Sequence, residues 1–498
     1  DLTVNVFASS IGDGNMRLFA GSGNIVLNDK MSPGSGHLSI IAEKSIMQNA
    51  LILTSDGTIE FKATDNITMK TGVITSTANN VLYETMQGDI TINEIDAQQG
   101  NVGIVATNGS INLLDNNGEE NIIAHGLILN AGKTIDPIKT SVSLLTAMSG
   151  GDLIVENTNV NGVTIDEITL EIFRIESDGV TPETPEAFKF SDVTAKNEGA
   201  ISLNSAGSIT VNDGDDDNIA INASEGTGNI LLLSQSDAIS IQSKVDAGTG
   251  SISLIADSSI TAGSADNTES HIMTTDGTID MQATDNITIF DGNTISANAN
   301  IRMFADEVMT IGSIQANGAS VSLTANNITD SGTDDLDILA KELMIQSIQG
   351  VGTIDNMLDI AVETLSANVN DAGIFIHEMD GIHIDDVGEI SVNRVAIDGS
   401  LEETALLDTI SAGIVSKGDV QLHVDNGDTI INQITSQGNI TITNDAGSII
   451  DHADDQTIDL TAGNEKLITL TVAENIQGNT TDTFLEVADA SIINAYST

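Results

Sequence analysis

The feature of this sequence that most constrains its fold is a short unit repeated at a steady spacing. The first apolar residues of five successive units are Met16, Leu38, Ile59, Val81 and Val102, so the step from one unit to the next is nearly constant. A unit this short cannot bury its own apolar side, so it must stack on neighbours of the same kind. Such a spacing is typical of a solenoid, in which each repeat contacts only the repeats beside it.

The pattern inside one unit predicts short strands joined by corners. In the segment 54–72, TSDGTIEFKATDNITMKTG, apolar Ile59 and Phe61 alternate with polar residues, as in a strand with one buried face. Asp65-Asn66 then favours a corner, because these short side chains bond to their own backbone. Further apolar runs follow at 67–69 and 73–74. Three strands and three corners predict an all-β, right-handed parallel β-helix with about 20–22 residues per coil.

A block of coils is duplicated within the chain. Segment 54–72 returns as TTDGTIDMQATDNITIFDG at 274–292. GSGHLSIIAEKSI at 34–46 returns as GTGSISLIADSSI at 248–260, at a slightly smaller offset. Because the register survives this difference, we expect insertions to lie at corners of the coils.

Two segments interrupt the rhythm. Residues 156–198 contain two of the four prolines, which suit positions outside a hydrogen-bonded ladder, so an inserted loop or hairpin is predicted there. We expect it to protrude. Coils are predicted at 1–155, at 199–335 as the duplicated block, and at 336–498 in a less regular form with a looser segment near 394–417.

The charge balance limits the partners. Asp and Glu number 73 against 16 Lys and Arg, which gives a net charge of −57. Nucleic acid and anionic membranes would be repelled, whereas cations would be attracted. No Cys is present, so neither a disulfide nor a thiolate zinc site can form. The sequence shows no membrane span and no secretion signal, and we interpret it as a mature or excised stretch of a longer secreted chain.

The repeat carries a family resemblance. GSISLIADSSI, GTIDMQATDNI and GAISLNSAGSI share the pattern Gly-x-Ile-x-Leu-x-Ala/Ser-x-x-x-Ile, with Met in place of Leu in the second. This pattern resembles the repeat region of filamentous haemagglutinin-like large exoproteins and related bacterial adhesins. The Asn-Pro-x-Gly-Ile motif of that family's secretion domain does not occur in this sequence. The resemblance implies a right-handed β-helix shaft that is exported and displayed at the cell surface.

One stretch has the composition of a metal or hydrolytic site. The segment 377–386, HEMDGIHIDD, holds His377 and His383 among four carboxylates. His383 and Asp385 alternate with isoleucines, so both are expected on the outer face of one strand. Imidazole and carboxylate together can bind zinc or manganese, or share proton transfer. The alternative is a solvated outer face.

The densest acidic run is a candidate calcium loop. Carboxylates crowd into 213–218, and calcium takes six to eight oxygen ligands. The spacing matches neither the twelve-residue helix-loop-helix motif nor the nonapeptide of calcium-binding β-rolls, so an acidic solvated corner is the alternative. No other cofactor is expected. The candidate ligands are Asp213, Asp215, Asp216 and Asp217.

These features favour a structural or adhesive role over catalysis, and no catalytic residue is assigned. An adhesive version places a contact surface for a receptor or glycan on the 156–198 insertion, at Phe173, Phe188 and Phe190. A fibre version places function at the ends, through self-association or continuation into more coils. The alternative is a polysaccharide lyase or hydrolase, but the chain has no Trp, two Tyr and only four Arg. We expect those arginines to lie far apart: Arg17, Arg174, Arg302 and Arg394.

Overall fold

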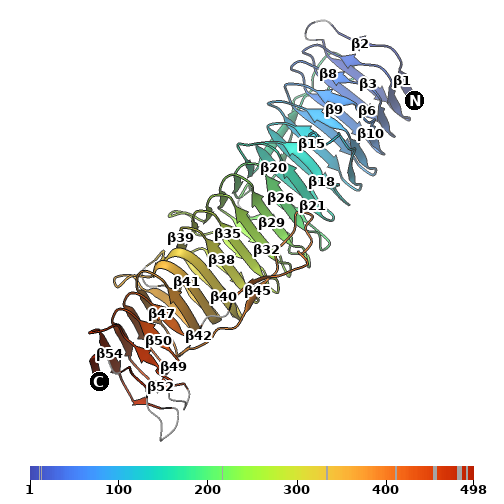
Figure 1. The fold of residues 1–498 in the computed structure, drawn as a ribbon. Helices are drawn as coiled ribbons and strands as arrows, with labels where there is room; N and C mark the ends of the chain where they lie inside the picture. Colours follow the sequence, from blue (N-terminus) through green and yellow to red (C-terminus); the bar gives the residue numbers. More distant parts are fainter. Residues whose placement is uncertain are drawn as a thin grey trace. The chain divides into compact units, whose positions relative to one another are not determined.

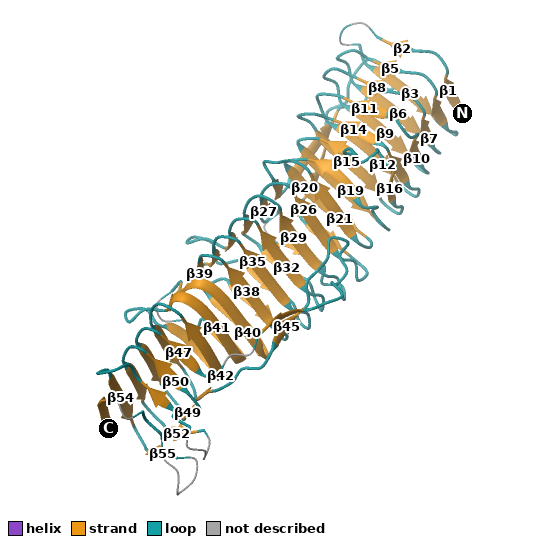
Figure 2. Ribbon diagram, viewed as in Figure 1, coloured by secondary structure: helices purple, strands orange, loops and turns teal. Residues whose placement is uncertain are grey.

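The chain is described by a computed structural model at residues 1–10, 12, 14–215, 217–332, 335–409, 412–452, 457–478, 485–488 and 492–497. Over these residues the regular structure is entirely β, and parallel coils stack into a β-solenoid of about 22 turns (Figure 1). Figure 2 shows strands and loops without a helix. The predicted fold class, an all-β parallel solenoid, is therefore confirmed. A search of the described part of the chain finds no helix with the length and apolarity to cross a membrane.

Two compact units make up the chain and are described separately. The first unit comprises residues 1–250 with 395–400, and the second comprises residues 251–394 with 401–498.

In the first unit each coil has three sides. One coil is formed by β9 (Ile59–Ala63), β10 (Ile67–Met69) and β11 (Ile74–Ser76). The register places Ile59 opposite Leu38 in the coil before and Val81 in the coil after. Met16 and Val102 extend the same row, so the spacing in the sequence is the spacing of the coils.

Each side of the first unit is a parallel ladder. The first ladder contains β3 (Met16–Ala20), β6 (Leu38–Ala42), β9, β12 (Val81–Thr85), β15 (Asn101–Ala106), β18 (Gly126–Ala131) and β20 (Leu144–Ser149). The second contains β2 (Ala8–Ser9), β5 (Met31–Ser32), β8 (Ile52–Leu53), β11, β14 (Glu94–Asp96), β17 (Ile122–Ile123), β19 (Ile138–Ser141), β21 (Leu153–Asn157), β26 (Ile201–Ser205) and β29 (Ile230–Ser234). The third contains β1 (Leu2–Val4), β4 (Ile25–Leu27), β7 (Ile46–Gln48), β10, β13 (Ile90–Ile92) and β16 (Ile111–Leu113). The remaining coil strands of this unit are β22 (Val163–Ile165), β25 (Val193–Ala195), β27 (Ile209–Val211), β28 (Ile219–Asn222), β30 (Ile239–Ile241) and β31 (Lys244–Asp246).

The second unit opens with the same three-sided coil. Its first strands are β32 (Ile252–Ala256), β33 (Ile260–Ala262), β34 (His271–Met273), β35 (Ile279–Ala283), β36 (Ile287–Ile289), β37 (Thr294–Ala297), β38 (Ile301–Ala305) and β39 (Val308–Ile311). β40 (Ser313–Asp330) then pairs in succession with β37, β38 and β39, so one strand covers three sides. Gly318, at φ +74°, turns the chain within it. β41 (Ile338–Val351) and β42 (Leu358–Val369) are similarly long.

Short strands resume toward the end of the second unit. They are β43 (Ile374–Glu378), β44 (Ile382–Ile384), β47 (Ile414–Ser416), β48 (Val420–Val424), β49 (Thr429–Ile431), β50 (Ile434–Ser436), β51 (Ile440–Asn444), β52 (Ile449–Asp451), β53 (Leu460–Thr461), β54 (Leu467–Val472), β55 (Ile476–Gln477) and β56 (Ile492–Ser497). In both units the core is mainly aliphatic. One aromatic pair, Phe61 and Tyr83 of adjacent coils, stacks inside the first unit with ring centroids 4.4 Å apart.

Two antiparallel hairpins stand outside the parallel ladders. The first strap, residues 168–190, consists of β23 (Ile168–Ile172) and β24 (Glu186–Phe190) with their connection. The second strap, residues 390–408, consists of β45 (Ile390–Val392) and β46 (Leu406–Asp408) with theirs, of which 395–400 belong to the first unit. A hairpin was predicted within 156–198, and its flanks there form the coil strands β22 and β25. In the looser segment 394–417, residues 410 and 411 lie outside the described part.

Candidate functional site

The first strap lies on an apolar row of the coils. Leu82, Gly103 and Ile128 are in register on three consecutive strands and face outward. Ile168, Leu170 and Ile172 of β23 cover them, and these apolar side chains form one buried cluster. A side chain at position 103 would obstruct this approach, because a Cβ atom there would lie 2.6 Å from Cδ2 of Leu170. The sequence therefore places a docking row for the strap on the outside of three adjacent coils.

The three phenylalanines predicted to project from the shaft lie against it instead. Phe188 and Phe190 are half-buried and pack against the cluster around Leu170. Phe173 stacks on His37 with ring centroids 4.7 Å apart. The expectation of a protruding surface is wrong, because burying the apolar row draws the hairpin onto the coils. A binding role for these three residues stays a prediction.

An ion pair fixes the first strap at its turn end. Arg174 donates from Nε and Nη2 to the carboxylate of Glu60, at 2.9 Å from Nε to Oε1. The Glu60 side chain is fully buried, whereas that of Arg174 is 22% exposed. A buried carboxylate is costly unless it is paired, so Glu60 depends on this guanidinium. The backbone N–H of Phe173 also donates to Oγ1 of Thr58, at 3.2 Å.

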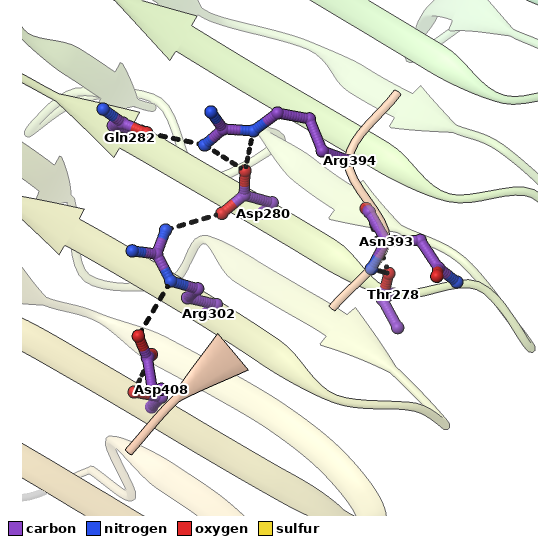
Figure 3. Close-up of polar contacts among 8 residues, drawn as sticks. Thr278, Asp280, Gln282, Arg302, Asn393, Arg394 and Asp408 are labelled. Atoms are coloured by element: carbon purple, nitrogen blue, oxygen red, sulfur yellow. Dashed lines mark hydrogen bonds and ion pairs between the residues drawn. The ribbon is translucent and has the colours of Figure 1, made fainter. Parts of the chain in front are cut away.

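The second strap repeats this arrangement within the second unit. Figure 3 shows Asp280 between two guanidinium groups. Arg394 donates to Oδ2 of Asp280 from Nε at 3.0 Å and from Nη2 at 2.8 Å, and Arg302 donates from Nη1 to Oδ1 at 3.0 Å. Arg302 also donates from Nε to Asp408 of β46, at 3.2 Å. The fully buried Asp280 is therefore neutralised from both sides.

In each strap, the arginine and the buried carboxylate that it binds form what we call a clamp. The two clamps are copies of one another. Glu60 corresponds to Asp280, and Arg174 to Arg394, at the same offset that relates segment 54–72 to its repeat at 274–292. Each of these two arginines returns across 114 residues of sequence to its carboxylate. In the second copy the N–H of Asn393 donates to Oγ1 of Thr278, at 2.8 Å. Phe173 and Thr58 form the same hydrogen bond in the first copy.

One expectation about the arginines is therefore wrong. They were expected to lie far apart, but Arg302 and Arg394 share one carboxylate because the strap folds back. A sequence signal for this exists: IFRIESDG at 172–179 and VNRVAIDG at 392–399 keep Arg and Asp-Gly at the offset of the duplicated block.

A second group of functional interest is an imidazole–carboxylate cluster in the second unit. β42, β43 and β48 are successive neighbours in one ladder, and their register places Asp359 opposite His377 and His377 opposite His423. Both imidazoles face outward, since the residues beside them in each strand are buried. The rings lie 5.0 Å apart between centroids. Asp425 immediately follows β48 at the corner of its coil.

Both ring nitrogens of His377 face carboxylates. Nδ1 lies 2.6 Å from Oδ1 of Asp359, and Nε2 lies 2.9 Å from Oδ1 of Asp425. Nε2 of His423 lies 3.8 Å from the same Asp425 oxygen and 3.0 Å from Oδ2 of Asp445. Burial lowers the pKa of His377, but the hydrogen bonds to Asp425 and Asp359 outweigh this effect and hold it above its ordinary value.

The sequence prediction for this region placed only one of its three residues in the cluster. His377 takes part, whereas His383 is exposed and lies near His452, with ring centroids 6.5 Å apart. Asp385 accepts from Nδ2 of Asn432 at 2.6 Å and lies 3.4 Å from Nε2 of His452. The partners of His377 were missed because His423 lies far along the chain. The second strap leaves the coils between them, so spacing within one segment gave no signal.

The acidic loop at 213–218 mainly bonds to its own backbone. Asp213 accepts from the N–H groups of Asp215 and Asn218, and Asp217 accepts from Ile219. Asp216 lies outside the described residues. Asp192, which the sequence did not suggest, brings a carboxylate oxygen within 4.8 Å of oxygens of Asp213 and Asp215. Burial and the neighbouring acidic charges raise the pKa of Asp192 to about 6. Calcium binding here stays a prediction.

Comparison of the chain with protein-family models, with curated proteins and with solved structures finds no match.

Proposed function

We propose that this chain is a structural or adhesive shaft segment of a secreted bacterial surface protein or extracellular fibre. The observation that carries the proposal is the pair of matched clamps. In each clamp, an arginine of an inserted hairpin neutralises a buried carboxylate of an earlier coil, 114 residues before it in the sequence. Such insertions reinforce a stack of coils against separation, which is what a shaft requires.

The arginine contacts argue against the alternative, a polysaccharide-active β-helix enzyme. Arg174, Arg302 and Arg394 are all bound to carboxylates in the clamps. An arginine held in this way is not free to bind a substrate's carboxylate. A chain with a net charge of −57 would also repel acidic polysaccharides.

The proposed setting is extracellular or at the cell surface, as the resemblance of the repeat to adhesin shafts implies. The partners we propose are further coils, other copies of the chain, or a surface receptor or glycan. The exposed strap residues Glu171 and Lys189 offer a test of the adhesive version, because they lie outside the buried cluster.

Electron microscopy and a bead-attachment assay test the proposal together. We expect elongated particles that join into longer shafts, and beads coated with the chain that attach to cells without degrading polysaccharides. Loss of attachment in Glu171→Ala/Lys189→Ala with shafts intact would place adhesion on the first strap. Globular particles that release sugars from a polysaccharide would contradict the proposal.

A further inference from the structure

We propose that His377, His423, Asp425 and Asp445 bind one divalent transition-metal ion of the zinc class. This site is separate from the clamps and does not depend on the shaft function. Three consecutive strands supply it: β43 carries His377, β48 carries His423 and leads into Asp425, and β51 leads into Asp445.

Three of the four proposed ligands already converge. One atom from each of His377, His423 and Asp425 lies within 4.8 Å of the others. The Nε2 atoms of His377 and His423 are 2.9 and 3.8 Å from the same Asp425 oxygen, and Asp445 is 3.0 Å from Nε2 of His423. Neighbouring ligands around tetrahedral zinc are separated by about 3.3 Å, given metal–ligand distances of about 2.0–2.1 Å. The atoms of His377, His423 and Asp425 therefore need only small movements to surround one ion, and Asp445, beside Nε2 of His423, is the fourth ligand that we propose.

Asp359 orients the first imidazole. Its carboxylate lies 2.6 Å from Nδ1 of His377, and Asp359 is only 8% exposed. A proton held between Nδ1 and this carboxylate leaves the Nε2 lone pair of a neutral His377 facing Asp425. Metal-binding histidines in proteins commonly have such a carboxylate behind the ring.

The carboxylates around the two imidazole rings give the site a negative charge that attracts a cation. Asp359 and Asp425 lie beside the two nitrogens of His377, and Asp425 and Asp445 lie beside Nε2 of His423, so three carboxylates surround the two rings. One divalent ion satisfies Asp425, Asp445 and both Nε2 atoms at once. Imidazole ligands favour zinc, cobalt or nickel over calcium and magnesium, which prefer oxygen.

Bound metal would stabilise the base of the second strap. His377 precedes the excursion that contains β45 and β46, and His423 follows it. The ion would cross-link the coil before the excursion to the two coils after it. Metal affinity would therefore add to the stability of these coils.

The test uses the full chain, stripped with a chelator and titrated with Co²⁺ and Zn²⁺. We expect one Co²⁺ per chain with the visible absorption of tetrahedral cobalt, displaced by Zn²⁺ but not by Ca²⁺ or Mg²⁺. His423→Ala and Asp425→Asn should abolish this spectrum. Asp359→Asn, which alters only the group behind the ring, should weaken Zn²⁺ binding about 10–100-fold.

The matched control is His383→Ala, which removes an exposed histidine of the neighbouring β44. It should bind like the wild type. Circular dichroism without metal verifies that each variant is folded, and His423 is outward-facing, so its removal leaves the core intact. The proposal is overturned if the wild type shows no tetrahedral spectrum, if His423→Ala binds equally well, or if His383→Ala loses as much affinity.

Discussion

Glu60 and Asp280 are fully buried carboxylates whose partners arrive from a distant part of the sequence. Breaking such a pair from one side leaves an uncompensated charge in the interior, which costs more than the pair itself contributes. These residues therefore make coil stability depend on strap docking.

Replacing Arg174 should expose this dependence. Arg174→Ala is expected to lower the free energy of unfolding by about 3–5 kcal/mol, because Glu60 stays buried without a partner. Adding Glu60→Gln should recover part of the loss, since no charge is then stranded. Lys62→Ala breaks a more exposed pair with Glu84 and should cost less than about 1 kcal/mol. Urea unfolding followed by circular dichroism measures all three, and equal losses for Arg174→Ala and Lys62→Ala would contradict the clamp.

Asp337 predicts a pH dependence of stability. Burial, with repulsion from Asp330 and Asp359, raises its pKa to about 9 from 3.8. The neutral carboxyl can donate to the carboxylate of Asp330, whose Oδ2 is buried and has no other hydrogen-bond partner. Between these two pKa values the folded protein holds a proton that the unfolded chain releases, so this group's contribution to stability falls as pH rises from about 4 to about 9.

Asp337→Asn keeps the neutral form at every pH. The variant should therefore melt at a higher temperature than the wild type at pH 8, and the difference should shrink toward pH 4. Thermal melts at several pH values test this. Melting temperatures that change in parallel for the two proteins would show that Asp337 does not hold the proton.

The docking of each strap requires room for its side chains on the outer surface of the coils. Gly103→Val is expected to push Leu170 off the row that includes Leu82 and Ile128, because the added side chain would occupy its place. Trypsin should then cut at Arg174, which the docked strap holds against Glu60. Gly388→Val is the control, since a Cβ atom there meets nothing within 4 Å. Equal cleavage of both variants would argue against this packing.

The sequence predicted those elements whose contacts are made between neighbouring repeats, and it missed those whose contacts are made to distant segments. The coils were predictable because Ile59 pairs with residues one unit away, and alternation records which side is buried. The docking of the straps was not, because Leu82 and Ile128 look like exposed positions until a distant hairpin covers them. The sequence predicted only one histidine of the imidazole–carboxylate cluster for the same reason: His377 stands in the acidic segment 377–386, whereas its partner His423 follows the second strap.

At the scale of the whole molecule, the net charge of the chain predicts that its stability and its association depend on the ions in solution. With a net charge of −57, stability and association should both increase as salt shortens the screening length from about 30 Å at 0.01 M to about 8 Å at 0.15 M. Divalent cations should act at lower concentration and bridge neighbouring copies. Sedimentation with and without a chelator measures this, and unchanged association would exclude bridging.

Hydrogen exchange followed by mass spectrometry tests the central claim, that the inserted hairpins are docked parts of the solenoid, most directly. Peptides from β23 and β24 should exchange as slowly as those from the coil strand β9. In Arg174→Ala the strap peptides should exchange faster while those of distant coils stay protected. Strap amides that exchange in the wild type as fast as an unstructured peptide would contradict the account.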